Sequence, residues 1–305
     1  MSAAITYSRY GAPEVLTLSD VPTPQPGPGQ VRVRVRAVAV NPIDLRVRSG
    51  GMAGVFPVQF PVIPGHDVAG VVDEAGEGSG FSRGDEVFGS VHGGGYSECV
   101  LLDQPFAKPR DLSFEDAAAL VTVGETAYRV LEHLAVAPGQ TLLVHAAGGA
   151  VGAVAVQLAV ARGITVVGTA GDHDLDRVRG LGATAVRYGE GWAERVRAAV
   201  PAVDHVLDTA GVGVLADSVA LTGDAARVIT IADMTSAEHG VRFTGLDPAD
   251  RFPQALPLLA DLVADGRLSV PVWRTFPLSE AAKAHAEIEA GHNRGKVVLL
   301  PWQDH

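Results

Sequence analysis

The spacing of apolar residues between positions 141 and 171 predicts a strand, a helix and a second strand in succession. Leu142 to Val144 form a short apolar run of the kind that is buried on both faces of a parallel sheet. From Ala153 the apolar residues recur at helical spacing as far as Arg162-Gly163, and Ile164 to Gly168 resume as a strand. This stretch therefore predicts one βαβ unit.

The alternation of strands and helices continues beyond this unit. Further strands are expected at 183–188, 203–208 and 227–232, with helices at 192–200 and 214–221. Such alternation predicts a doubly wound parallel sheet, on which ligands bind beyond the carboxyl ends of the strands. The candidate ligand-binding residues at those strand ends include Asp208, Thr209 and Ala232.

The first hundred residues have a different pattern, with short alternating strands between Pro- and Gly-rich turns. The clearest is 31–40, and the turn chemistry predicts a small barrel or sandwich. Helical period begins near Ser113, a candidate N-cap, and runs to about residue 135. A capped helix and a strand in 276–301 fit a return to this first domain. The expected domains are 1–120 with 270–305, and 121–269.

The turn after the first strand of the βαβ unit carries Ala147, Gly149 and Gly152 in the register of G-x-G-x-x-G, with alanine in the first place. Glycine lets backbone N–H groups approach a pyrophosphate, and the following helix offers its N-terminus. Because a strand precedes the turn and a helix follows it, we expect a dinucleotide to bind there rather than a purely structural turn. The residues expected to contact it are Gly148, Gly149, Ala150, Val151 and Gly152.

The end of the second strand bears on which dinucleotide binds. NAD sites usually carry an acid there, whereas this chain has Thr169, Ala170 and Gly171. A small neutral strand end leaves room for a 2′-phosphate, and Arg177 is one of three nearby cations that could reach it. Interleaved aspartates, such as Asp174, would oppose a phosphate if they faced it. We expect NADPH rather than NADH.

Composition narrows the class of protein. The chain has 305 residues, 47% apolar and 19% charged, enough for about two ordinary globular domains. A formal net charge of −11 lacks the electrostatic footprint of a nucleic-acid binder. Cys99 is the single cysteine, which fits a reducing compartment, and no apolar run approaches the length of a membrane span. We expect a cytoplasmic protein that binds neither nucleic acid nor membrane.

Several motifs, taken together, resemble a known family. They are Ala39-Val-Asn-Pro-Ile-Asp, Pro64-Gly-His-Asp-Val-Ala-Gly-Val-Val, Gly84-Asp-Glu-Val-Phe-Gly, Gly94-Gly-Tyr-Ser-Glu, Thr126-Ala-Tyr, Ala146-Ala-Gly-Gly-Ala-Val-Gly, Leu181-Gly-Ala and Gly295-Lys-Val-Val-Leu. In this order they resemble the zinc-independent medium-chain dehydrogenases/reductases of the quinone oxidoreductase (zeta-crystallin-like) group. The resemblance implies a GroES-like β-barrel domain plus a Rossmann domain, with substrate and nicotinamide meeting in the cleft.

The activity that the resemblance implies is NADPH-dependent reduction of quinones or of the C=C bond of α,β-unsaturated carbonyls. The places that match the catalytic zinc ligands of related alcohol dehydrogenases hold Asn41, His66 and Thr122. One imidazole does not make a zinc site, so we expect no metal, and His66 is expected to pair with Asp67. Without a Lewis acid, hydride addition to a conjugated acceptor is easier than alcohol oxidation.

The resemblance also implies roles for single residues. Asn41 would lie by the nicotinamide and substrate, with Asp44 orienting its loop, although an Asx-type turn around Pro42 explains both residues equally well. Thr126 would contact the nicotinamide half, and Tyr188 the 2′-phosphate ribose, as Gly171 and Arg177 would. His92 is a candidate proton donor, and an exposed loop histidine is the alternative.

Two other functions remain open from the sequence. The same fold serves enoyl-thioester or tailoring reductases of biosynthetic pathways, and the lost first glycine would also suit a nucleotide-binding sensor with little turnover. A homodimer is expected, because it is the commonest soluble assembly and the family's habit agrees.

Overall fold

A computed structural model describes residues 1–211, 213–291 and 294–302. Contacts between Cα atoms divide the chain into two compact units. Unit 1 contains Met1–Thr122 and Leu256–His305, and unit 2 contains Val123–Ala255. The first division falls inside one long helix, α2 (Phe114–Leu134). Each unit is described by itself below.

Unit 2 is built on a parallel sheet of six strands. They are β8 (Thr141–His145), β9 (Thr165–Ala170), β10 (Thr184–Arg187), β11 (His205–Asp208), β12 (Val228–Thr230) and β13 (Arg242–Phe243). The spatial order is β10-β9-β8-β11-β12-β13, and every neighbouring pair is parallel. In order along the chain this is 3-2-1-4-5-6, the order of a dinucleotide-binding sheet, so the predicted doubly wound sheet is confirmed. The short strand β13 was not predicted.

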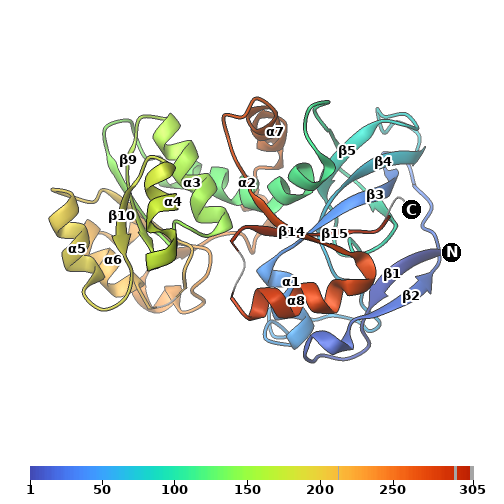
Figure 1. Cartoon of the computed structure of the whole chain (residues 1–305), viewed down its shortest axis with the longest axis horizontal. Coiled ribbons are helices and arrows are strands. Elements are labelled where there is room, and N and C mark those ends of the chain that lie inside the picture. The colour runs from blue at the N-terminus through green and yellow to red at the C-terminus, as the bar shows by residue number, and fades with distance from the viewer. Residues whose placement is uncertain (212, 292–293, 303–305) are drawn as a thin grey trace. The chain divides into compact units, whose positions relative to one another are not determined.

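Helices pack around this sheet, as Figure 1 shows. They are α3 (Ala150–Ala161), α4 (Leu175–Gly180), α5 (Trp192–Ala199) and α6 (Leu215–Thr222). Helix α3 begins three residues before its predicted start, because Gly149 supplies an extended N-cap and helical backbone follows at once. It ends as predicted, with Gly163 in the left-handed conformation (φ 74°). The order reversal of the sheet lies between β8 and β11.

Unit 1 is rich in strands. A two-stranded antiparallel sheet pairs β1 (Ser2–Thr6) with β2 (Thr17–Val21). A seven-stranded sheet contains β3 (Val31–Val40), β4 (Asp67–Ala75), β5 (Glu86–Ser90), β6 (Cys99–Leu102), β7 (Phe106–Ala107), β14 (Val272–Pro277) and β15 (Lys296–Leu300). The long strand β3 is central, since it pairs antiparallel with β4, β6 and β15. The predicted strand at 31–40 and the predicted C-terminal return are therefore both present.

Three helices belong wholly to unit 1: α1 (Pro42–Ser49), α7 (Leu256–Ala264) and α8 (Ala281–Glu289). Helix α8 lies beside α1 (Figure 1). The predicted cap of α2 is confirmed, because the Asp116 N–H donates to the Ser113 hydroxyl at 3.0 Å. Short 3-10 helices occupy Pro13–Val15, Asp172–Asp174, Ala225–Arg227, Ser236–His239, Pro248–Asp250, Pro253–Ala255 and Leu278–Glu280.

Within the described ranges, no helix combines the length and the apolarity that a membrane crossing requires.

Candidate functional site

The turn between β8 and α3 brings the start of the helix close to the end of the strand. Ala146 has a left-handed backbone (φ 54°), and α3 starts at Ala150 with Gly149 as N-cap. A Cβ on Gly152 would lie 2.4 Å from the Ala146 carbonyl oxygen, so only glycine lets the helix approach the strand this closely. Among the residues that the structure describes, no side chain caps the N-terminus of α3. Its first N–H groups have no partner within the helix, and such a helix start suits a phosphate.

Asp208 and Thr230 join the ends of β11 and β12 to each other, and Thr209 joins the end of β11 to the end of β8. The Asp208 carboxylate accepts the N–H groups of Ala210 and Gly211 at 2.8 and 3.1 Å, and the Thr230 hydroxyl at 2.7 Å. The Thr209 hydroxyl donates to the His145 carbonyl at 2.6 Å. Asp208 is therefore committed to shaping the strand ends, and any contact it makes with a cofactor is through the loop it holds.

Ala232 extends the same rim at the end of β12. Its N–H donates to the Thr230 hydroxyl at 3.1 Å, and it lies against Gly211, whose added Cβ would be 2.8 Å from the Ala232 carbonyl oxygen. The predicted residues Thr209 and Ala232 thus lie at the carboxyl edge of the sheet, where ligands of this fold bind.

The ends of β9 and β10 hold the residues expected at the ribose phosphate. The Tyr188 ring is exposed and lies against Gly171, where an added Cβ would be 3.2 Å away. Arg177 lies 3.9 Å from Asp174, whose side chain covers Gly148. The structure therefore brings Tyr188 and Gly171 together, and it places the opposing Asp174 carboxylate over the glycine turn.

A buried histidine beneath the turn was missed by the sequence analysis, because it reads as the polar end of a strand. The His145 ring lies between the hydroxyls of Thr169 and Ser218, each 3.1 Å from one ring nitrogen. Trp192 packs on it edge to face at 4.6 Å. Burial lowers the pKa of His145 to about 4, although the charge of Asp208 opposes this. The ring is therefore neutral at pH 7 and acts as a polar spacer between strands and helix.

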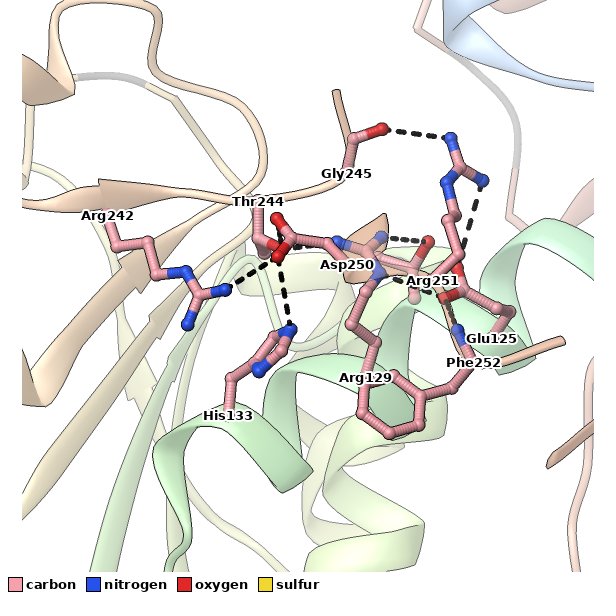
Figure 2. Close-up of polar contacts among 10 residues, drawn as sticks. Glu125, Arg129, His133, Arg242, Thr244, Gly245, Asp250, Arg251 and Phe252 are labelled. Carbon is pink, nitrogen blue, oxygen red and sulfur yellow. Dashed lines mark hydrogen bonds and ion pairs between the residues drawn. The ribbon is translucent and has the colours of Figure 1, made fainter. Parts of the chain in front are cut away.

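Thr126 bonds to a polar cluster on the α2 segment of unit 2. Figure 2 labels Glu125, Arg129 and Thr244 of this cluster. The Thr126 hydroxyl accepts from Arg129 Nη2 at 3.1 Å. Figure 2 shows the same guanidinium reaching Glu125, at 3.0 Å, and Thr244, at 2.8 Å. The Phe252 N–H also donates to Glu125 at 2.9 Å. The buried Arg129 therefore fixes α2 to the 244–252 segment, and it leaves Thr126 its hydroxyl proton to donate.

In unit 1, Asn41 and Asp44 form the start of helix α1. Asn41 is its extended N-cap, Pro42 occupies the first turn, and the Asn41 N–H donates to Asp44 Oδ2 at 2.9 Å. The two residues form a capping box at the start of a helix, where the sequence suggested an Asx-type turn around Pro42. Both side chains are buried, however, and each carries further contacts that a solvent-exposed cap would not need.

The Asn41 amide lies between two ionisable groups. Its Nδ2 donates to Asp67 Oδ2 at 2.9 Å, and its Oδ1 accepts from Lys296 Nζ at 2.6 Å. Lys296 also donates to the Val40 carbonyl at 3.0 Å. Thr122 donates to Asp67 twice, from its N–H at 3.1 Å and from its hydroxyl at 2.7 Å. These contacts fix one orientation of the amide, with a cation at its oxygen and a carboxylate at its nitrogen.

Burial moves the pKa values of these two ionisable groups toward their neutral forms. Burial raises the pKa of Asp67, and the Lys296 charge and the hydrogen bonds from Asn41 and Thr122 partly offset this rise. Burial lowers the pKa of Lys296, and the charges of Asp67 and Asp44 partly offset this fall. Each group therefore depends on the other to remain charged.

A second chain of contacts leads from Asp44. Its Oδ1 lies 2.9 Å from His66 Nδ1, and its Oδ2 accepts the Tyr96 hydroxyl at 3.4 Å. The Tyr96 oxygen lies 2.9 Å from His285 Nε2. The expected pairing of His66 with Asp67 is wrong. The imidazole pairs with Asp44, and the Asp67 carboxylate accepts hydrogen bonds from Asn41 and Thr122. Successive residues of an extended chain point to opposite faces, which separates the two neighbours.

The charges in this chain follow from burial and contact. Burial raises the pKa of Asp44, but the hydrogen bond and charge of His66 and the Asn41 N–H outweigh it, so the pKa is lowered and Asp44 is a carboxylate. Burial lowers the pKa of His285 to about 4 and raises that of Tyr96 well above its usual value. At neutral pH, His285 is therefore neutral and donates through Nε2 to Tyr96, which donates to Asp44.

With this geometry in place, comparison with known proteins is informative. A family model described as alcohol dehydrogenase GroES-like domain matches residues 27–111, and one described as zinc-binding dehydrogenase matches residues 181–299. The chain is 32% identical over 323 residues to the quinone oxidoreductase of Mus musculus, covering 97% of each chain. The chain belongs to the zinc-independent quinone oxidoreductase group of medium-chain dehydrogenases/reductases. It is an oxidoreductase with a GroES-like domain and a Rossmann-type sheet, as predicted.

Two further relatives are informative. A 2-methylene-furan-3-one reductase of Solanum lycopersicum is 31% identical over 316 residues, covering 98% of this chain and 79% of that one. The structure of Escherichia coli quinone oxidoreductase complexed with NADPH superposes with a TM-score of 0.85 at 25% identity, covering 98% of this chain and 100% of that one.

The side chains at the matched zinc-ligand positions show whether this chain could hold a metal ion there. In the described ranges, no three His, Cys, Asp or Glu side chains gather as they would around a metal ion. At the three places that the sequence analysis matched to zinc ligands, Asn41 and Thr122 both bond to Asp67, and His66 bonds to Asp44. The site is thus held by hydrogen bonds and the Lys296 ammonium, which the sequence analysis did not single out.

His92 lies apart from this network. Its side chain is 97% exposed, and Asp103 lies 4.0 Å from its Nε2. Its role as proton donor stays a prediction.

Proposed function

We propose that this chain is a metal-independent NADPH-dependent reductase of small conjugated acceptors, either quinones or the C=C bond of α,β-unsaturated carbonyls. The observation that carries the proposal is the uncapped start of α3 at the order reversal of a 3-2-1-4-5-6 sheet. A relative of the same fold and full coverage is complexed with NADPH. When bound, a reduced nicotinamide supplies hydride.

Most of the residues proposed to hold NADPH lie at the carboxyl edge of the unit 2 sheet, and Thr126 of α2 and Asn41 of unit 1 complete the set. The N–H groups of the turn and of the start of α3 would bind the pyrophosphate, and Tyr188 with Gly171 would flank the adenosine ribose. Thr126 would donate to the nicotinamide half through its remaining proton. The full set is Asn41, Thr126, Gly148, Gly149, Ala150, Val151, Gly152, Gly171, Arg177, Tyr188, Asp208, Thr209 and Ala232.

Unit 1 is proposed to supply the acceptor site, with Asn41 and Asp44 at its centre. Hydride addition to a conjugated acceptor places negative charge on an oxygen, which hydrogen-bond donors can stabilise without a metal. Reduction of an enone is favoured by one specific relative, since a 2-methylene-furan-3-one carries a C=C bond conjugated with a ketone. The domain roles, a homodimer and a cytoplasmic location are part of the same proposal.

The test is steady-state oxidation of NADPH, and of NADH in parallel, with 1,4-benzoquinones, 2-alkenones and crotonyl-CoA as acceptors. Turnover of quinones or alkenones with NADPH, with the reduced product identified by mass spectrometry, supports the proposal. A preference for crotonyl-CoA would instead support a thioester reductase. Tight NADPH binding with no acceptor turned over would support a sensor. A Tyr188→Ala variant should weaken NADPH binding by about 5-fold, because an apolar stacking contact is worth about 1 kcal/mol.

A further inference from the structure

We propose that His66, oriented by Asp44, is the proton donor of the reduction, an inference that rests on the function proposed above. Its observation is a largely buried polar network in which the imidazole of His66 reaches the surface. Asn41, Asp44, Asp67, Tyr96, His285 and Lys296 are all buried. The His66 side chain is 39% exposed and hydrogen-bonded to a carboxylate that is fully covered. Among the described residues, His66 is therefore the titratable member of this network that meets solvent or a substrate.

The hydrogen bonds of the Asp44 carboxylate decide which of its oxygens faces His66. Oδ2 accepts the Asn41 N–H and the Tyr96 hydroxyl, so Oδ1 is left for the imidazole. Because Asp44 is ionised, His66 Nδ1 carries the hydrogen of this bond. The proton that His66 can give away is then the one on Nε2. A buried carboxylate that fixes the tautomer and orientation of an imidazole is the arrangement used for general acid–base catalysis on unrelated folds.

The backbone holds the dyad in place from two sides. His66 directly precedes β4, after Gly65, whose left-handed backbone (φ 92°) lies so close to Tyr96 that an added Cβ would be 2.2 Å from the ring. Asp44 stands in the first turn of α1. The Tyr96 ring thus supports both partners, packing under Gly65 and donating to Asp44.

The proposed step balances. For an enone, hydride from NADPH forms a C–H bond at the β-carbon, and the C=C electron pair becomes an enolate. The His66 imidazolium transfers its Nε2 proton to the enolate oxygen, and the enol isomerises to the ketone. His66 is left neutral with its Nδ1–H on Asp44, and solvent restores the second proton. For a quinone, the same proton goes to the phenolate oxygen. His66 is the catalytic residue here, and Asp44 is the positioning residue.

The experiment compares His66→Asn with His92→Asn, since asparagine at 66 can still donate to Asp44. His66→Asn should lower kcat/KM for a 2-alkenone by about 100-fold or more, because its enolate is basic, and by less than about 3-fold for tetrachlorobenzoquinone, whose anion needs no proton. Added imidazole should restore part of the alkenone activity. NADPH binding should not change in either variant. The comparison decides between the two candidate donors, because the acceptor-dependent loss should appear in the variant of the residue that gives the proton, which we propose is His66.

Three outcomes would overturn the proposal. The first is an equal loss with both acceptors in His66→Asn, which indicates a structural role. The second is no loss of activity in His66→Asn. The third is an acceptor-dependent loss in His92→Asn instead. A wild type that turns over no acceptor removes the proposed function itself, so the two failures are distinguishable. Independently of activity, ¹⁵N spectra of the cofactor-free protein should show the neutral His66 ring protonated on Nδ1, with that preference lost in Asp44→Asn. A ring protonated on Nε2 contradicts the dyad.

Discussion

Lys296 Nζ donates a hydrogen bond of 2.6 Å to the amide oxygen of Asn41, 255 positions earlier in the chain. The contact follows from the antiparallel pairing of β15 with β3, which places Val297 opposite Val40. On the other side of the same amide, Nδ2 donates to Asp67. A neutral side chain therefore bridges a buried cation and a buried anion, at the place where the sequence analysis compared the chain with metal-binding relatives.

Lys296→Met should destabilise unit 1 by about 3 kcal/mol, because Asp67 loses the charge that offsets its burial. Removing both partners should cost less than the sum of the single changes, since no charge is then left unpaired. Urea unfolding of Lys296→Met, Asp67→Asn and the double variant measures this coupling. Additive losses would show that the two residues do not depend on each other through Asn41.

Gly152→Ala should weaken NADPH binding by about 10-fold and cost about 2 kcal/mol in stability, because its Cβ would be 2.4 Å from a backbone oxygen and the turn must shift. Gly180→Ala is the matched control, since an added Cβ there meets nothing within 4 Å. Fluorescence titration with NADPH compares the two. Unchanged affinity in Gly152→Ala would remove the glycine turn from the binding site.

The parts of the fold that follow from local chemistry were predictable. Strand β8, the glycine turn and α3 lie within about twenty residues, and their periodicity and small residues suffice to place them. Strand β13 was missed because two residues, Arg242 and Phe243, carry no periodicity. The start of α3 was placed late because the residues before Ala153 are small, and small residues suit a turn and a helix equally.

The site divides in the same way. Asn41 and Asp44 could be named from a motif, since they lie three residues apart. Lys296 could not, because in its own strand it is one polar residue before an apolar run, and its partners depend on which strands pair. The pairing of His66 with Asp44 was missed for a related reason. Asp67 is adjacent in sequence, and only the folded structure shows that its side chain points away from His66 toward Asn41.

Stability should fall as the pH drops from about 6.5 to 4, in part because of His285. The pKa of His285 is lowered to about 4 in the folded protein against 6.5 in the unfolded chain. The unfolded chain therefore binds more protons in this window, so the stability contributed by the neutral ring is complete above pH 6.5 and is lost toward pH 4.

The loss can reach about 3 kcal/mol from this group. Urea midpoints measured across the window for the wild type and His285→Gln test it, because glutamine can still donate to Tyr96 but does not titrate. The variant should show a shallower decline. Part of its remaining decline should come from His145 and His205 in unit 2, because burial lowers the pKa of both. Parallel pH profiles would mean that His285 does not titrate in this way.

Arg129→Met should cost unit 2 about 3 kcal/mol, because the buried Glu125 would lose its main cation and Thr244 its donor. Burial lowers the pKa of Arg129 and the Glu125 charge opposes this, so the cation depends on that pair. Arg242→Met is the control: its ion pair with Asp250 is half-exposed (Figure 2) and should be worth less than about 1 kcal/mol.

Hydrogen exchange should localise the damage. In Arg129→Met, amides of the 244–252 segment should exchange faster, because this segment is joined to α2 through Arg129 and through the Phe252 N–H on Glu125. In Arg242→Met the same amides should keep most of their protection. If NADPH binding also weakens only in Arg129→Met, the Arg129 guanidinium positions Thr126 for the cofactor, because it donates to the Thr126 hydroxyl oxygen. Equal exchange in the two variants would show that the buried guanidinium does not hold this segment.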